Sequence, residues 1–176
     1  MDIEQLKYPI GKYTPPETIT TAHIAEWATS IATLPQHLEE AVKGLTESQL
    51  DTPYRPDGWT VRQVVHHLAD SHMNAFIRFK LTITEDNPTI KPYFEDRWAQ
   101  LADSSMPVDV SITLLKALHA RWIVLLQSLS SDDLERTYFH PQYQYTVPLA
   151  RVVGLYAWHS NHHLGHITAL KERNNW

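Results

Sequence analysis

The stretch GWTVRQVVHHLADSH, residues 58–72, opens with the clearest helix start in the chain. Thr60 is a natural N-cap, and Gln63 stands three residues later, where its side chain can reach back and complete a capping box. Apolar residues then recur at the spacing of one helical face. The sequence therefore predicts a long helix over about 61–85, and this helix carries three histidines.

Helical periodicity continues through the rest of the chain, whereas short alternating strands between glycine-rich turns are nearly absent. Three further long helices are predicted over about 20–43, 108–129 and 147–173, and a short one at 94–103. The first of them tolerates Pro35 as a kink. For the last, Thr146 is predicted as the cap, with Pro148 in the first turn.

A short internal repeat links the two halves of the chain. LTESQLDTPY (45–54) and LSSDDLERTY (129–138) each follow a long helix and precede a histidine-rich one. The pattern predicts an all-α fold, a four-helix bundle made of two helical hairpins related by a pseudo-twofold axis. We expect one domain over 1–176, with residues 1–18 as an extended N-terminal arm. Bundles of this kind place metal sites in the core, on facing helices.

Composition narrows the class of protein. Hydrophobic residues make up 43% and charged residues 20%, and the net charge of −5 lacks the clustered Lys and Arg that nucleic-acid binding needs. The N-terminus carries Asp2, Glu4 and Lys7 where a signal peptide needs an apolar run, and no stretch reaches the length of a membrane span. We expect a cytoplasmic protein that binds a small molecule, without nucleic acid or membrane.

The segment WHSNHHLGH, residues 158–166, contains two pairs of histidines at the i, i+4 spacing. Such a pair places two imidazoles on adjacent turns, where they can hold one metal ion. His159 and His163 lie centrally on the apolar stripe of their helix, and His162 and His166 form the competing pair. Since the chain has no cysteine, a transition-metal site must use histidines and carboxylates.

Two histidines do not complete a site, and the 61–85 helix offers three more. His72 lies in the middle of the apolar stripe, His67 on its border, and His66 on the side predicted to face solvent. Helical counting slightly favours His72 over His67 as the third ligand. Elsewhere, surface positions are predicted for His23 and His37, a core or ligand-supporting position for His119, and the bundle mouth for His140.

Several motifs together resemble the YfiT branch of the DinB-like superfamily, over Tyr8 to Trp176. They are YPIG, LDTPYRPDGWTVRQVVHHLADSHMNAFIRFKL, HARW, HP and GLYAWHSNHHLGHI. Members of this branch are described as metal-dependent hydrolases, and the branch includes bacillithiol S-transferases.

The resemblance implies a homodimeric four-helix bundle with one divalent metal held by three histidines. On this sequence the ligands it implies are His67, His159 and His163, so it favours His67 over His72. The side chains expected to orient these ligands are His72, Tyr156, His162 and His166.

Three imidazoles leave open coordination positions, as in catalytic zinc sites, so we expect Zn, with Ni as the alternative. Such a metal activates either water, in a hydrolase, or a thiol such as bacillithiol, in an S-transferase. The sequence shows no carboxylate beside the ligands, because Asp70 is predicted to face solvent, and this favours the thiol. A metal-binding bundle without catalysis is the third alternative.

Overall fold

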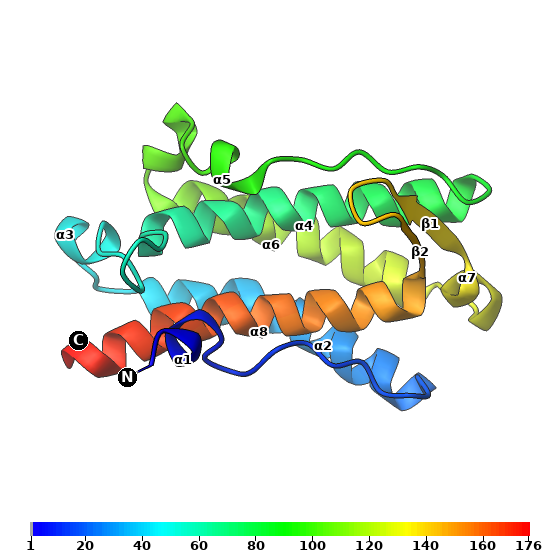
Figure 1. Ribbon diagram of the computed structural model, residues 1–176, viewed down its shortest axis with the longest axis horizontal. Helices are drawn as coiled ribbons and strands as arrows, with labels where there is room; N and C mark the ends of the chain where they lie inside the picture. The colour runs from blue at the N-terminus through cyan, green and yellow to red at the C-terminus, as the bar shows by residue number, and fades with distance from the viewer. Residues whose placement is uncertain (1) are drawn as a thin grey trace.

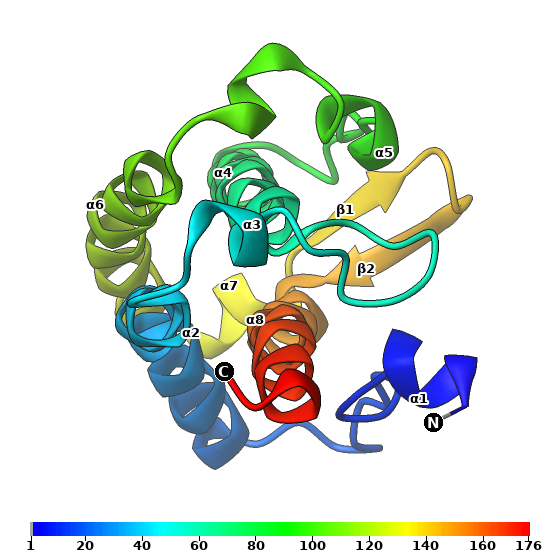
Figure 2. The same cartoon turned by 90° about the vertical axis from the view of Figure 1, so that its left-hand side faces the viewer.

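Four long helices lie side by side and form the body of the molecule (Figures 1 and 2). The computed structural model describes residues 2–176. The long helices are α2 (Thr21–Val42), α4 (Val61–Thr84), α6 (Val108–Gln127) and α8 (Leu149–Asn174). The predicted four-helix bundle is confirmed, and each long helix begins and ends within two residues of its predicted limits.

Short elements precede and connect the long helices. They are α1 (Ile3–Lys7), α3 (Glu47–Leu50), α5 (Glu95–Trp98), the 3-10 helix η1 (Ala102–Ser105) and α7 (Ser131–Glu135). Two of them, α5 and η1, replace the single short helix predicted at 94–103. A β-hairpin, which the sequence did not predict, precedes α8: β1 (Thr137–His140) pairs antiparallel with β2 (Tyr145–Pro148).

The hairpin corrects the predicted start of the last helix. Thr146 does not cap α8 but lies in β2, opposite Phe139, and is exposed. The residue before a proline is driven out of the helical region, so Val147 stays extended and the helix begins only after Pro148, at Leu149.

The internal repeat appears in the backbone hydrogen bonds. Thr46 caps α3, and at the equivalent position Ser130 caps α7. The first residue of α4 donates its N–H to Thr52 O (3.2 Å), and Leu149, the first residue of α8, donates to Arg136 O (2.9 Å). Thr52 and Arg136 occupy the same position in the two repeat sequences. The two halves thus enter their second helices in the same way, which supports the pseudo-twofold relation.

Two apolar clusters fill the bundle, and most of its histidines lie between them. One cluster contains Leu68 of α4 and Ile167 of α8, and the other contains Phe79, Trp122 and Val152. The stretches of α4 and α8 that separate the clusters carry a band of buried imidazoles. None of the helices within residues 2–176 has the length and apolarity needed to cross a membrane.

The N-terminal arm runs along α8, as Figure 1 shows. After α1 it is extended, and three hydrogen bonds tie it to α8: Tyr13 Oη to Arg151 O, Trp158 Nε1 to Gly11 O, and His166 Nε2 to Lys7 O. The last of these bonds connects the arm to the band of imidazoles.

Thr60→Ala and Thr146→Ala form a matched pair of cap variants. Thr60 Oγ1 accepts from Gln63 N–H at 3.1 Å, and Gln63 Oε1 accepts from Thr60 N–H at 3.0 Å. We expect Thr60→Ala to lower the free energy of unfolding by about 1 kcal/mol. Thr146→Ala should change it by less than about 0.5 kcal/mol. Urea unfolding monitored by circular dichroism measures both, and equal losses would contradict the observed start of α8.

Candidate metal centre

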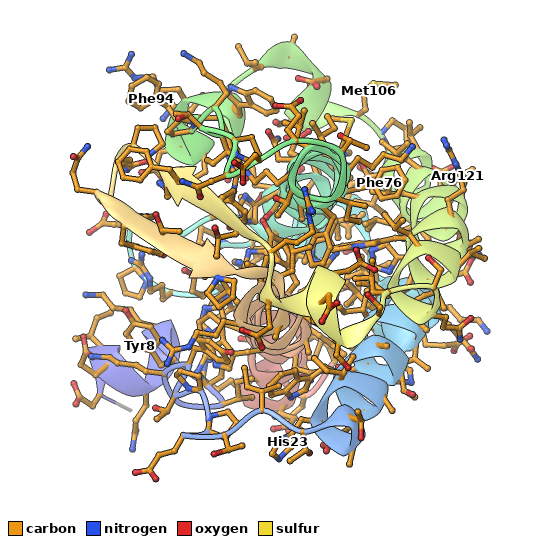
Figure 3. All side chains as sticks on the ribbon, turned by 90° about the vertical axis from the view of Figure 1, so that its right-hand side faces the viewer. Tyr8, His23, Phe76, Phe94, Met106 and Arg121 are labelled. Carbon is orange, nitrogen blue, oxygen red and sulfur yellow. The ribbon has the colours of Figure 1, made fainter. Side chains whose placement is uncertain are left out.

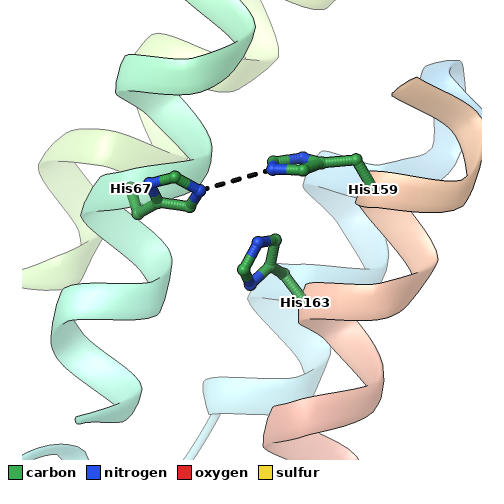
Figure 4. Close-up of side chains that lie close together, drawn as sticks. All are labelled: His67, His159 and His163. Carbon is green, nitrogen blue, oxygen red and sulfur yellow. Dashed lines mark hydrogen bonds between the residues drawn. The ribbon is translucent and has the colours of Figure 1, made fainter. Parts of the chain in front are cut away.

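Three histidines from two facing helices converge on one point (Figure 4). His67 comes from α4, and His159 and His163 come from adjacent turns of α8. One nitrogen of each ring can be chosen so that all three lie within 4.8 Å of one another. His67 and His163 are buried and His159 is partly exposed, so the point of convergence lies at the edge of the core.

One nitrogen–nitrogen distance in this group matches the spacing of two ligands on a metal ion. Two ligands at about 2.0–2.1 Å from a tetrahedral ion lie about 3.3–3.4 Å apart. His67 Nε2 and His159 Nε2 are 3.3 Å apart, a distance that also allows a hydrogen bond between them in the metal-free protein. The structure thus brings together the three residues that the family resemblance implied, with nitrogen donors that suit Zn, Ni, Co or Cu.

A chain of buried hydrogen bonds fixes the tautomer of His159. Ile31 O accepts from His119 Nδ1 at 2.7 Å, so the neutral His119 ring presents an unprotonated Nε2. That atom accepts from His72 Nδ1 at 2.9 Å, and His72 Nε2 in turn accepts from His159 Nδ1 at 3.3 Å. His159 is left with a lone pair on Nε2, the atom that faces His67. Backbone and histidines therefore prepare His159 as a ligand.

Burial keeps these imidazoles neutral, the form that binds a metal. It lowers the pKa of His67 to about 4 and that of His119 also to about 4. The pKa values of His72, His159 and His163 fall well below the ordinary value, first by burial and then by the neighbouring histidines.

A second group of histidines adjoins the first. His162, His163 and His166 also bring one nitrogen each within 4.8 Å of one another, but all three come from α8. His166 Nε2 donates to Lys7 O at 3.0 Å, and its ring stacks on Tyr54 with centroids 3.9 Å apart. His166 Nε2 and the face of its ring therefore already have partners in the arm and in Tyr54, whereas His67 and His159 line the cavity described below.

His67 and His72 both contact His159, on opposite ring nitrogens. This contact explains why counting helical turns could not separate them. His72 is fully buried and is enclosed by His119 on its other side, whereas His67 borders the cavity. Tyr156, another predicted supporting residue, stands edge-on to His72 with ring centroids 5.3 Å apart.

The prediction that His66 faces solvent was wrong. His66 is 7% exposed, its Nδ1 lies 2.7 Å from Ser111 Oγ, and its Nε2 lies 3.0 Å from Met106 O. The segment from η1 to the start of α6 covers this side of α4, an effect of chain path that helical counting cannot detect.

The remaining histidines lie largely where the sequence placed them. His37 is exposed, and His23 is half-buried in the capping box of α2. His119 is buried behind His72, and His140 lines the cavity.

A cavity of about 310 Å³ borders His67, His159 and His163. Its other walls come from α4, α8, the hairpin and residues 92–95. Glu95, in the connection between α4 and α6, is among the lining residues, and no sequence pattern linked it to the histidines. Asp70 lies outside the cavity walls but is half-buried, and burial, followed by the Asp103 charge, raises its pKa to about 6. Asp70 therefore keeps partial contact with solvent.

Comparison with known protein families places the chain among related sequences. A model of the DinB superfamily matches residues 30–167. A Bacillus mycoides (strain KBAB4) protein named "Putative metal-dependent hydrolase" is 57% identical over 174 residues, which cover 99% of this chain and 100% of that protein. A Bacillus cereus (strain 03BB102) protein with the same name is 56% identical over the same shares.

Solved structures support the same relation. YfiT from Bacillus subtilis, described as "a probable metal-dependent hydrolase with an unusual four-helix bundle topology", superposes with a TM-score of 0.95 at 48% identity, over 98% of this chain and 99% of that one. A mycothiol-dependent maleylpyruvate isomerase has a TM-score of 0.61 at 17% identity, over 78% of this chain and 57% of that one, a likeness of fold alone. The resemblance to the YfiT branch is confirmed.

The buried histidines predict a marked pH dependence of stability for the metal-free protein. The pKa values of His67, His119 and His166 are about 4 in the folded chain and near 6.5 when unfolded. Below pH 6.5 the unfolded chain therefore binds protons that the folded chain does not, and stability falls towards pH 4. Each of the three should contribute a loss of roughly 2 kcal/mol between pH 7.5 and 5. Asp70 opposes the loss, because its raised pKa favours the folded state at low pH.

Urea midpoints at pH 7.5, 6 and 5 measure this slope. The exposed His37→Gln variant serves as the control and should keep the wild-type slope, whereas His119→Gln should flatten it. Equal stability of the wild type at pH 7.5 and pH 5 would contradict burial of neutral imidazoles.

Proposed function

The chain belongs to the DinB superfamily, and from that premise we propose that it is a metal-dependent hydrolase whose divalent metal is held by His67, His159 and His163. The observation that carries the proposal is the convergence of these three rings from two helices at the wall of a cavity. The names of its relatives support the metal dependence. We propose Zn as the metal, with Ni as the alternative, because neutral imidazoles suit both.

A divalent metal on three neutral imidazoles lowers the pKa of water and also stabilises a thiol as its thiolate. The protein's own part is to hold the ligands in one protonation state and orientation. Burial and the hydrogen bonds from Ile31 through His119 and His72 do this for His159. His159 then need not lose a proton or turn when the ion binds.

Glu95 is the one carboxylate among the described residues that line the cavity. We propose that it accepts a proton from water during hydrolysis. A carboxylate at this wall favours hydrolysis. From the sequence alone no carboxylate was expected beside the ligands, and this had favoured thiol chemistry. The tyrosines and Trp59 that line the rest of the cavity would limit access of bulk water.

Thiol S-transfer, with bacillithiol as co-substrate, is the second candidate. It is favoured by the donor set itself, since three neutral ligands leave the full positive charge of the metal to attract a thiolate. Homodimer formation stays a prediction, which light scattering on the purified protein checks.

Metal content tests the ligand set. Plasma mass spectrometry on untagged protein should find about one metal per chain in the wild type and little in His159→Ala or His163→Ala. His162→Ala is the matched control from the competing pair and should keep its metal. Loss of metal in His162→Ala with retention in His159→Ala would place the site in the α8 group instead. A metal-free wild type that is fully folded would refute the proposal.

Turnover separates the three functions. Metal-loaded protein is offered 4-nitrophenyl esters without thiol, and a chromogenic alkylating electrophile with and without bacillithiol. Ester cleavage without thiol that falls at least about tenfold in Glu95→Gln supports the hydrolase. Turnover only with thiol supports the transferase, and bound metal with neither activity leaves a metal-binding bundle.

A further inference from the structure

The cavity that borders the three histidines extends along α4 to a guanidinium. Arg78 follows His67 by eleven residues, which is about three turns, so both side chains lie on the same face of α4, about 16 Å apart along its axis. Ser71 lies between them, and all three residues line the cavity. Helical side chains lean towards the N-terminus, which directs Arg78 back towards His67.

Arg78 has few partners of its own. Its Nη2 donates to Lys91 O at 3.3 Å, while its Nε is buried and has no hydrogen-bond partner among residues 2–176. No carboxylate of the described residues lies within 4.0 Å of it, Glu95 included. The contrast is Arg62, which pairs with both Glu47 and Asp51. A guanidinium with a buried, unpaired donor lacks the counter-ion that such groups normally have.

Two tyrosines, Tyr138 and Tyr156, line the cavity together with this guanidinium and the histidines. Burial raises the pKa of Tyr138 and Tyr156, and the nearby positive charge of Arg78 opposes both rises. The Tyr156 ring lies 5.6 Å from the His159 ring, centroid to centroid. Tyr156 thus lies beside His159 in the cavity wall that also includes Arg78.

We propose that Arg78 is the binding site for a carboxylate of the substrate, so that the enzyme acts on small carboxylate-bearing molecules with an apolar body. The inference rests on the proposed function for the reaction, though not for the binding. The planar guanidinium fork matches a carboxylate, and the tyrosine hydroxyls can donate to the same oxygens. The tyrosine rings of the hairpin and α8 form an apolar wall for the rest of the molecule. A single guanidinium suits one negative charge better than the two of a phosphate monoester.

Binding to the metal-free protein tests the site independently of catalysis. The probes are 4-nitrobenzoate and its neutral counterpart 4-nitrobenzamide, and titration calorimetry measures their affinities. The wild type should bind 4-nitrobenzoate more tightly than 4-nitrobenzamide. In Arg78→Gln the ratio of the two affinities should fall by about tenfold or more. Arg121→Gln removes the same charge from the outer face of α6, as Figure 3 shows, and should behave like wild type. Arg78→Lys keeps the charge without the fork and should fall in between.

Kinetics with the metal-loaded enzyme add a second readout. Two esters are compared, 4-nitrophenyl hemisuccinate, which carries a carboxylate, and the neutral 4-nitrophenyl butyrate. In Arg78→Gln the kcat/KM for the hemisuccinate relative to that for the butyrate should fall about tenfold, because the KM for the hemisuccinate rises. Absence of ester cleavage with the carboxylate preference intact would refute hydrolysis but not the binding site. A wild type without preference between the two probes, or an Arg78→Gln variant that is folded by circular dichroism and keeps the preference, overturns the inference.

Discussion

The neutrality of a buried band of imidazoles is the constraint on which the site depends. The rings adjoin two apolar clusters, where a charged imidazole is far more costly than a neutral one. Hydrogen bonds join His67, His159, His72 and His119 into one chain that ends at Ile31 O, and a separate bond from His166 ends at Lys7 O. A carbonyl only accepts hydrogen bonds, so each end sets which nitrogen of the adjacent histidine carries the proton. For His159 the outcome is a free Nε2 at the cavity wall.

Features set by local sequence could be predicted. The long helices follow from periodicity, and the capping box of Thr60 marks the start of α4 correctly. The pairing of His159 with His163 follows from helical geometry alone. The four-helix architecture needed only one further assumption, that the short repeat reflects two related halves.

Features set by the path of the chain could not be predicted. His66 is buried because η1 and α6 cover it, and Glu95 reaches the cavity from a connection without a periodic signal. The choice between His67 and His72 depends on how α4 lies against α8, since both rings contact His159. The hairpin was missed because its strands are only four residues long. Family resemblance favoured His67 where periodicity did not.

The internal repeat also accounts for the open side of the site. Counted from the first residues of α4 and α8, His67 is equivalent to Leu155, and His159 is equivalent to Ser71. All four residues line the same cavity, so both halves direct the same helical positions towards it. A fully symmetric set would surround an ion with imidazoles from both helices and close its coordination, as in a structural site. Leucine and serine at two of these positions break the symmetry and leave room for a substrate beside the ligands.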